Sequence, residues 1–261
     1  MDFGLDDRTA LVTGGAGRLG SEDCKQLARE GADVVVLDVD VDGAERVVEE
    51  IEDDEDATGA AMAVECDLTD REDVNATVEA LEAETGGIDV LVNNAGFVDA
   101  IAKLEDFDDE LWDRDVELNL TGAYNVTKAV YPGMKERGWG RIVTMASIAG
   151  WRGSFAQISY STTKSGLIGF GKTLALEGAK YGVTSNVLTP SIVVEDLAEM
   201  EPDQLEAFNP QFERIRQATP MQELGREDDV APLVCYLSSE QARYVTGQVI
   251  GVTGGADLFS Y

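Results

Sequence analysis

The sequence predicts an α/β protein, built as a doubly wound parallel sheet of about seven strands with helices on both faces. Short apolar runs alternate along the chain with longer amphipathic stretches, which is the pattern of βαβ units. The 261 residues are 44% hydrophobic and 27% charged, as is usual for a soluble globular protein with a full core. We therefore expect a single domain over residues 1–261.

The strands are expected where short runs rich in valine, isoleucine, leucine and alanine occur. In chain order these runs cover residues 9–13, 33–37, 61–66, 89–92, 141–145, 183–188 and 248–252. Between them, helical periodicity predicts helices over residues 19–30, 42–53, 70–85, 111–137 and 159–180. Residues 191–224 break this rhythm, because they follow a strand end and are too long for a plain connection. They predict a mobile substrate lid that carries a short helix.

Glycines gather where the first strand meets the first helix, in the run Thr13-Gly14-Gly15-Ala16-Gly17-Arg18-Leu19-Gly20. Glycine there lets the backbone approach a pyrophosphate, which the N–H groups of the helix N-terminus attract. Asp38 ends the second strand, where a carboxylate can accept both hydroxyls of an adenosine ribose and would repel a 2′-phosphate. The pattern predicts a Rossmann-like site for NAD rather than NADP, unless Arg18 reaches the 2′-phosphate.

Tyr160 and Lys164 lie four residues apart, so in a helix both side chains would lie on one face. A fixed ammonium beside the phenol would lower a pKa that is ordinarily about 10. A hydroxyl from a separate segment, Ser147, could hold a carbonyl or alcohol oxygen next to that phenol. The spacing alone also suits an ordinary surface helix. The chain has no histidine, which excludes Ser-His-Asp triads, histidine-ligated zinc and histidine-dependent dehydrogenases.

Together these motifs resemble those of the short-chain dehydrogenase/reductase family, in its single-domain branch, over essentially the whole chain. The matching positions are the Thr13-Gly14 turn, Cys66-Asp67-Leu68, Asn93-Asn94-Ala95-Gly96, Asn119, Ser147, Tyr160 with Lys164, and Thr246-Gly247 with Gly254-Gly255. The resemblance implies that Tyr160 is the catalytic acid/base and that Ser147 orients the substrate oxygen. It also implies that Lys164 holds the nicotinamide ribose and lowers the phenol pKa, while Asn119 supports a proton-relay water.

The resemblance further implies a cofactor site in which Asp67 meets the adenine and residues 93–96 run along the cofactor. The residues expected to bind the dinucleotide are Gly14, Gly17, Arg18, Leu19, Gly20, Asp38, Asp67, Leu68, Asn94, Ala95, Gly96, Tyr160, Lys164, Pro190 and Ile192. No metal site is expected.

The chain departs from the family pattern at two places. Gly14, Gly17 and Gly20 follow the spacing of the longer, sugar-nucleotide-modifying branch, although 261 residues leave no room for its second domain. Ser191 follows Pro190 where glycine is usual, and Glu195 stands near the place of a common cofactor-contacting threonine.

The implied reaction is hydride transfer between nicotinamide and a secondary alcohol or ketone. A preference for NAD favours oxidation of a sugar, a polyol or a hydroxy acid. Gln157, three residues before Tyr160, instead resembles 3-oxoacyl-(acyl-carrier-protein) reductases, which commonly use NADPH. An NAD-sensing regulatory protein without turnover is the alternative from another functional class.

The residues expected around the substrate are Phe97, Val98, Trp151, Arg152, Phe155, Gln157, Met200 and Phe208. Among them, Arg152 could bind a carboxylate or phosphate of the substrate, or it could simply form a salt bridge.

The charge of the chain excludes several kinds of partner. Acids outnumber bases by 51 to 20, which gives a net charge of −31. Nucleic acids and anionic membranes need basic patches and are not expected partners. Three scattered cysteines and the lack of a signal or membrane segment indicate a cytoplasmic protein. The resemblance suggests a homotetramer, and the acids, which recur along the whole chain, suggest a salt-loving source.

This charge leads to a prediction about salt. Repulsion between exposed carboxylates should destabilise the fold in dilute buffer, and ions should screen it, because the Debye length falls from about 10 Å at 0.1 M to about 3 Å at 1 M. We expect the melting temperature and activity to rise between dilute buffer and molar KCl. Full stability and activity in dilute buffer would identify an ordinary acidic protein instead.

Overall fold

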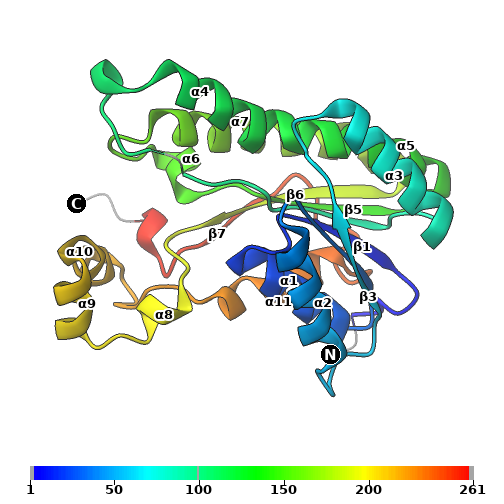
Figure 1. Ribbon diagram of the computed structural model, residues 1–261, viewed down its shortest axis with the longest axis horizontal. Coiled ribbons are helices and arrows are strands. Elements are labelled where there is room, and N and C mark those ends of the chain that lie inside the picture. The colour runs from blue at the N-terminus through cyan, green and yellow to red at the C-terminus, as the bar shows by residue number, and fades with distance from the viewer. Residues whose placement is uncertain (1–2, 99, 259–261) are drawn as a thin grey trace.

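Residues 3–98 and 100–258 are described in the computed structural model. Their sheet has the strand order β3-β2-β1-β4-β5-β6-β7, and every neighbouring pair is parallel (Figure 1). The strands are β1 (Thr9–Thr13), β2 (Asp33–Asp38), β3 (Ala61–Glu65), β4 (Val90–Asn93), β5 (Gly140–Met145), β6 (Val183–Pro190) and β7 (Val249–Val252). The chain runs outward from β1 in one direction and from β4 in the other, so the topological switch point lies between these two strands. The predicted fold class is confirmed.

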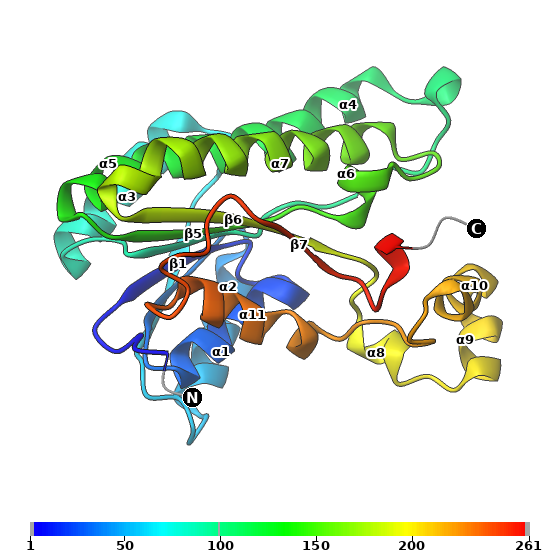
Figure 2. The same cartoon turned by 180° about the vertical axis from the view of Figure 1, so that it is seen from behind.

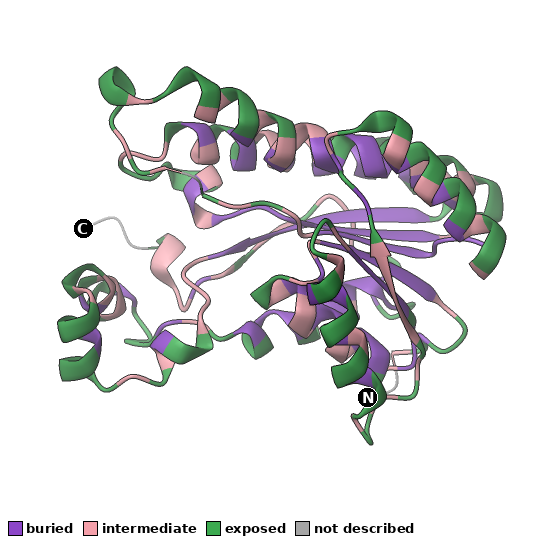
Figure 3. Ribbon diagram, in the orientation of Figure 1, coloured by how far each residue is buried: buried purple, intermediate pink, exposed green. Residues whose placement is uncertain are grey.

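Helices cover both faces of this sheet (Figures 1 and 2). One layer holds α3 (Arg71–Thr85), α5 (Ala123–Arg137) and α7 (Ile158–Gly178), and the other holds α1 (Arg18–Arg29), α2 (Val41–Glu52) and α11 (Ala231–Ser238). Successive strand residues point to opposite faces, so Leu11 belongs to one apolar cluster and Val12 to the other. The central strands are buried, as Figure 3 shows.

The long helix expected over residues 111–137 contains an irregular turn. It consists of α4 (Asp109–Val116), a π-helical turn over Glu117–Gly122, and then α5. A π turn widens the backbone ring by one residue and is uncommon outside functional sites. Asn119, one of the expected site residues, lies within it.

Outside residues 191–224, two of the α-helices were not expected from the sequence. Helix α6 (Ile148–Arg152) is a single short stretch after β5, too brief to show a period. Helix α11 is buried on most of its surface, so it lacks the polar face by which a helix is recognised. It packs against α1.

The segment after β6 carries three helices where one was expected. These are α8 (Glu195–Ala198), α9 (Pro202–Phe208) and α10 (Pro210–Ala218). Proline starts both α9 and α10, where its missing N–H costs no helical bond. The segment has its own apolar cluster around Leu197, Leu205 and Leu224 and stands to one side of the sheet (Figure 1). Its mobility as a lid stays a prediction.

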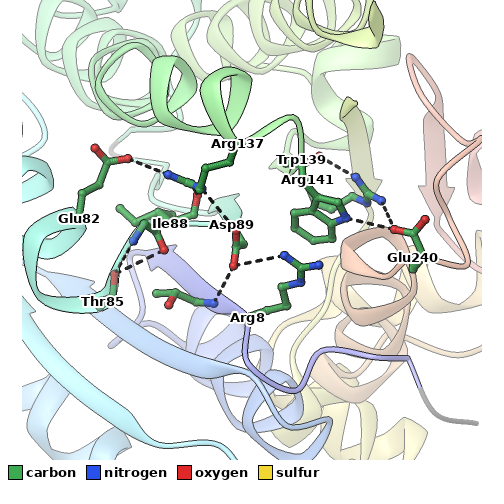
Figure 4. Close-up of polar contacts among 12 residues, drawn as sticks. Arg8, Glu82, Thr85, Ile88, Asp89, Arg137, Trp139, Arg141 and Glu240 are labelled. Carbon is green, nitrogen blue, oxygen red and sulfur yellow. Dashed lines mark hydrogen bonds and ion pairs between the residues drawn. The ribbon is translucent and has the colours of Figure 1, made fainter. Parts of the chain in front are cut away.

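Arginine side chains form hydrogen bonds and ion pairs at the amino ends of the strands (Figure 4). Arg141, only 2% exposed, donates to the carbonyls of Ser239, Gly140 and Gly182 and pairs with Glu240 at 3.1 Å. At the same edge, Arg8 and Arg137 both pair with Asp89. This end of the sheet is therefore held by polar contacts around the buried residues Arg141 and Asp89. A site can therefore form among the loops at the opposite, carboxyl ends of the strands.

None of the helices within residues 3–98 and 100–258 combines the length and the apolar character that a membrane span requires.

One acidic side chain lies on the buried side of α1. Asp23 is fully buried, and within the described residues neither carboxylate oxygen has a hydrogen-bond partner. Burial, and to a lesser extent the nearby charge of Glu22, raises the pKa of Asp23 well above its ordinary value. The folded protein therefore holds Asp23 protonated over a pH range in which the unfolded chain has already released that proton. In that range Asp23 lowers the stability of the fold, and the loss grows as the pH rises.

We predict that Asp23→Leu, a change to a side chain of similar shape, stabilises the protein at pH 7. The expected gain in unfolding free energy is about 1–3 kcal/mol, the usual cost of a buried polar group without a partner. The gain should shrink as the pH falls toward the ordinary carboxylate pKa, because Asp23 is then protonated in both states. Denaturant unfolding of both proteins at pH 4 and pH 7 in the same salt measures it. An equal difference at both pH values would show that Asp23 does not titrate in this way.

Candidate active site

A cleft of about 340 Å³ opens at the carboxyl ends of β1 and β4, at the switch point of the sheet. Its lining residues are Gly14, Gly17, Arg18, Leu19, Leu37, Asp38, Val39, Cys66, Leu68, Asn94, Ala95, Gly96, Phe97 and Leu118. Nine of the residues expected to bind a dinucleotide are among them: Gly14, Gly17, Arg18, Leu19, Asp38, Leu68, Asn94, Ala95 and Gly96. The sequence prediction and the position of the cleft therefore agree.

The two turns that form the floor of the cleft are joined by hydrogen bonds. The Asn94 amide nitrogen donates to the carbonyls of Thr13 and Gly14, at 3.1 and 3.0 Å. In return, the Thr13 hydroxyl accepts the N–H groups of Asn94 and Ala95. Gly14 has a φ of 65°, and a Cβ there would lie 2.8 Å from the Ala95 Cα. Only glycine allows this close approach.

The first turn of α1 fits the phosphates of a dinucleotide. Its N-cap, Gly17, supplies no side-chain hydrogen bond, and the turn contains no acidic residue. The first N–H groups of the helix are therefore available to an anion in the cleft. Gly20 does not line the cleft, and a Cβ at that position would collide with the Gly14 carbonyl. Glycine is therefore required at position 20 because the first turn of α1 packs closely against the Gly14 carbonyl.

Asp38 lies at the cleft with its carboxylate fixed by the backbone. One oxygen accepts the N–H of Ala16 and the other the N–H of Asp40, both at 3.1 Å. An oriented carboxylate at the end of β2 fits a ribose diol. Arg18, the residue that could have favoured a 2′-phosphate, instead pairs with Asp196 of α8 at 2.8 Å. The guanidinium thus reaches toward the segment over residues 191–224.

Five other expected cofactor residues do not line the cleft: Asp67, Tyr160, Lys164, Pro190 and Ile192. Asp67 turns its carboxylate to the N–H and hydroxyl of Thr69, while its neighbours Cys66 and Leu68 do line the cleft. Pro190 ends β6, and Ile192 packs in the apolar cluster of the 191–224 segment. Their expected contacts with a cofactor stay a prediction.

Ser147 and Tyr160 come together from two different elements. Ser147 follows β5 and caps α6, with its hydroxyl accepting the Ala149 N–H at 3.1 Å. Tyr160 lies in the first turn of α7. Burial raises the pKa of Tyr160, and the nearby Ser147 side chain opposes part of this rise. Two hydroxyl groups are thus presented side by side.

Lys164 lies one helical turn beyond Tyr160, as the spacing predicted. Its side chain is only 3% exposed, its Nζ donates to the Met145 carbonyl at 2.8 Å, and it stands 5.7 Å from the centre of the Tyr160 ring. Burial lowers the pKa of Lys164 to about 8. The expectation that Lys164 lowers the phenol pKa stays a prediction. The neighbour that lowers the pKa of Tyr160 is Ser147, whereas the ammonium is directed at a carbonyl and is itself weakened by burial.

Asn119 joins this group through the π turn. Its amide oxygen accepts the Phe97 N–H at 2.9 Å, and its nitrogen donates to the Phe97 carbonyl at 3.0 Å. A Cβ on Gly96 would lie 2.6 Å from Asn119 Oδ1 and 3.0 Å from Lys164 Nζ. Gly96, Asn119 and Lys164 therefore converge where the cleft ends. The four expected catalytic residues form one continuous cluster beside the cofactor cleft.

The structure also adds residues that the sequence did not single out. Leu37, Val39 and Leu118 line the cleft, and Val39 is 63% exposed. An exposed valine directly after the strand-ending Asp38 is the one signal that could have indicated an apolar ligand surface.

Apolar side chains surround the expected substrate end. They lie in segments that follow the carboxyl ends of β4 to β7, and the exposed ones are Val98, Ile101, Leu104, Trp151, Phe155, Phe208, Met221 and Leu258. Met200 differs from expectation, because it packs in the cluster of the 191–224 segment. Arg152 donates to the carbonyl of Ala256, so its guanidinium is engaged by the chain itself.

Comparisons with known proteins agree with this geometry. A family model described as enoyl-(acyl carrier protein) reductase matches residues 16–257. Nodulation protein G of Azospirillum brasilense is 36% identical over 253 residues, covering 96% of this chain and 98% of that protein. The 3-oxoacyl-(acyl-carrier-protein) reductase of Buchnera aphidicola subsp. Schizaphis graminum is 34% identical over 251 residues, covering 96% and 98%.

Two further similarities span nearly the whole chain. D-beta-hydroxybutyrate dehydrogenase of Cupriavidus necator is 33% identical over 261 residues, covering 96% of this chain and 98% of that protein. The structure of a short-chain type dehydrogenase/reductase from Mycobacterium ulcerans superposes with a TM-score of 0.89 at 30% identity, covering 97% of this chain and 91% of that one.

The position of Asp38 leads to a prediction about cofactor choice. Asp38→Asn removes the charge that would repel a 2′-phosphate but keeps an oxygen for a backbone N–H. We expect the ratio of kcat/KM for NADP to that for NAD to rise by at least about tenfold, since a like-charge contact costs several kcal/mol. Asp40→Asn is the matched control, because Asp40 caps α2 and does not line the cleft. An unchanged ratio in Asp38→Asn would rule out this role.

Proposed function

Because the chain belongs to the short-chain dehydrogenase/reductase family, we propose that it is an NAD(H)-dependent oxidoreductase that transfers a hydride between nicotinamide and a secondary alcohol or ketone. The observation that carries this proposal is the joining of two sites. The cleft at the switch point of the sheet is lined by Gly96, and a Cβ on Gly96 would meet Asn119 and Lys164, which lies one helical turn from Tyr160. Oxidoreductase chemistry on CH–OH or keto groups is what the family performs.

The bound nicotinamide would supply the hydride acceptor or donor. The chain itself supplies the proton and the orientation. Tyr160 Oη gives its proton to a ketone oxygen or takes one from an alcohol, and the Ser147 hydroxyl holds that oxygen in place. Burial raises the pKa of Tyr160, so the protonated phenol needed for reduction is present at neutral pH. The phenolate needed for oxidation is aided by the Lys164 ammonium, which its pKa of about 8 leaves largely charged at pH 7.

NAD rather than NADP is supported by the fixed carboxylate of Asp38 and by the pairing of Arg18 with Asp196. A 2′-phosphate would meet the Asp38 carboxylate, and it would have to displace the pairing of Arg18 with Asp196. The resemblance of the chain to D-beta-hydroxybutyrate dehydrogenase supports a hydroxy acid within the substrate group of sugars, polyols and hydroxy acids.

The apolar rim favours a second candidate. Exposed side chains such as Phe155, Phe208 and Met221 suit an apolar chain better than a sugar, and Arg152 is already engaged by Ala256. A reductase acting on 3-oxoacyl substrates would use such a rim, and the similarity to a 3-oxoacyl-(acyl-carrier-protein) reductase is consistent with it. A screen in molar KCl of NAD and NADP against sugars, polyols, 3-hydroxybutyrate and acetoacetyl thioesters discriminates the two.

We further propose that the protein works in the cytoplasm as a homotetramer adapted to molar salt. The tetramer is supported by the family resemblance and by exposed apolar side chains such as Leu176 on the outer helix layer. Light scattering in high salt measures the oligomeric state.

The role of Tyr160 is tested by Tyr160→Phe, which removes only the hydroxyl. Turnover should fall on the order of a hundredfold or more while NAD binding persists, because the proton donor is lost and the ring remains. Tyr131→Phe is the matched control, since the Tyr131 hydroxyl has no hydrogen-bond partner among the described residues and lies in α5. Near-normal turnover of Tyr160→Phe would refute the assignment. Tight NAD binding by the unmodified protein without any turnover would favour an NAD sensor.

A further inference from the structure

A buried hydrogen bond links α4 to the start of α7. The Ser159 hydroxyl donates to the carboxylate of Asp115, and the two side chains are 0% and 1% exposed. Neither residue lines the cofactor cleft or belongs to the cluster of Ser147, Tyr160, Lys164 and Asn119. A buried carboxylate is costly to retain without a partner, so a bond of this kind between two helices is worth explaining.

Both residues lie close in sequence to members of the proposed catalytic cluster. Ser159 immediately precedes Tyr160, and Asp115 lies four residues before Asn119. Because successive helical residues point about 100° apart, Ser159 can face α4 while Tyr160 faces Ser147. The bond therefore joins the helix that leads into the Asn119 π turn to the helical turn that carries the phenol.

The start of α7 lacks a side-chain cap. Its N-cap, Gln157, makes no side-chain hydrogen bond to the helix, so the usual fixation of a first turn is missing. Other contacts there include an exposed bond from the Ser154 N–H to the Ser161 hydroxyl, a backbone bridge between Ala102 and Gln157, and packing of α7 against α6 and α4. The Ser159–Asp115 bond is the buried side-chain contact that sets the rotation of this turn against α4.

We propose that Asp115 is a positioning residue for the proposed reaction: through Ser159 it fixes the Tyr160 hydroxyl relative to Asn119 and Ser147. This inference rests on the proposed role of Tyr160 as the proton donor and acceptor. Proton transfer at a reacting oxygen depends steeply on geometry, and a displacement near 1 Å can cost about a hundredfold in rate. NAD binding is governed by the cleft, which the Asp115–Ser159 pair does not line.

Three variants distinguish a positioning role of Asp115 from a purely structural role. Asp115→Leu and Ser159→Ala each remove the bond, and Asp115→Asn keeps an oxygen that can accept from Ser159. We expect kcat to fall about tenfold or more in the first two, with the Kd for NAD unchanged, and to recover in Asp115→Asn. The double variant Asp115→Leu/Ser159→Ala should be no slower than the slower single variant, because both changes break one contact.

Thr173→Ala is the matched control. It removes a helical hydroxyl of α7 that bonds only to the Gly169 carbonyl, away from Tyr160, and should leave kcat unchanged. Melting temperatures of all variants are measured in the same salt. If Asp115→Leu does not fold, Ser159→Ala decides, because it removes only one oxygen atom.

The outcomes are distinguishable from a failure of the proposed function. If Tyr160→Phe keeps its turnover in the same assay, the proposed function itself falls. If Tyr160→Phe is inactive but Asp115→Leu and Ser159→Ala keep normal kcat, Asp115 has no positioning role. Loss of kcat that Asp115→Asn does not restore, or that follows the melting temperature alone, would likewise overturn the proposal.

Discussion

The close approach of two backbone turns is the constraint on which the site depends. The chain leaves β1 through Gly14 and leaves β4 through Asn94 and Ala95, and the two turns touch where the strand order reverses. Thr13 and Asn94 exchange hydrogen bonds across this contact. Any side chain at Gly14 would force the turns apart and close the space that a pyrophosphate needs. The position of α1, of the cleft and of Gly96 at its far end all follow from this contact.

The proposed catalytic cluster depends on a second departure from regular structure. A regular helix through residues 109–137 would have no backbone widening at Asn119, but the π turn brings that side chain against Phe97 and beside Lys164. The cluster therefore combines a strand end at Ser147, a helix at Tyr160 and Lys164, and a π turn at Asn119. No single element carries it.

Much of this arrangement could be predicted from sequence, and the remainder has physical reasons for being hidden. Parallel strands buried on both faces give continuous apolar runs, so the sheet was predictable, and the glycine turn and Asp38 follow from the needs of a dinucleotide. Helix α11 lacks a polar face, and the three helices after Glu195 are too short to show a period. The pKa values of Tyr160 and Lys164 depend on burial, which spacing alone does not reveal. The side chains of Asp67 and Arg18 bond to Thr69 and Asp196, which do not belong to the sequence motifs. Their directions could therefore not be predicted either.

The end of the described chain also has a practical consequence. Gly254 accepts the Met221 N–H, and Ala256 accepts the Arg152 guanidinium, so the last turn is joined both to the 191–224 segment and to α6. Figure 1 places this turn near α10, on the side away from the amino end of the chain. An affinity tag or fluorescent label added after it would stand close to α6 and to the 191–224 segment. The amino end, near the arginine-fastened edge at Arg8, is the better place to attach one.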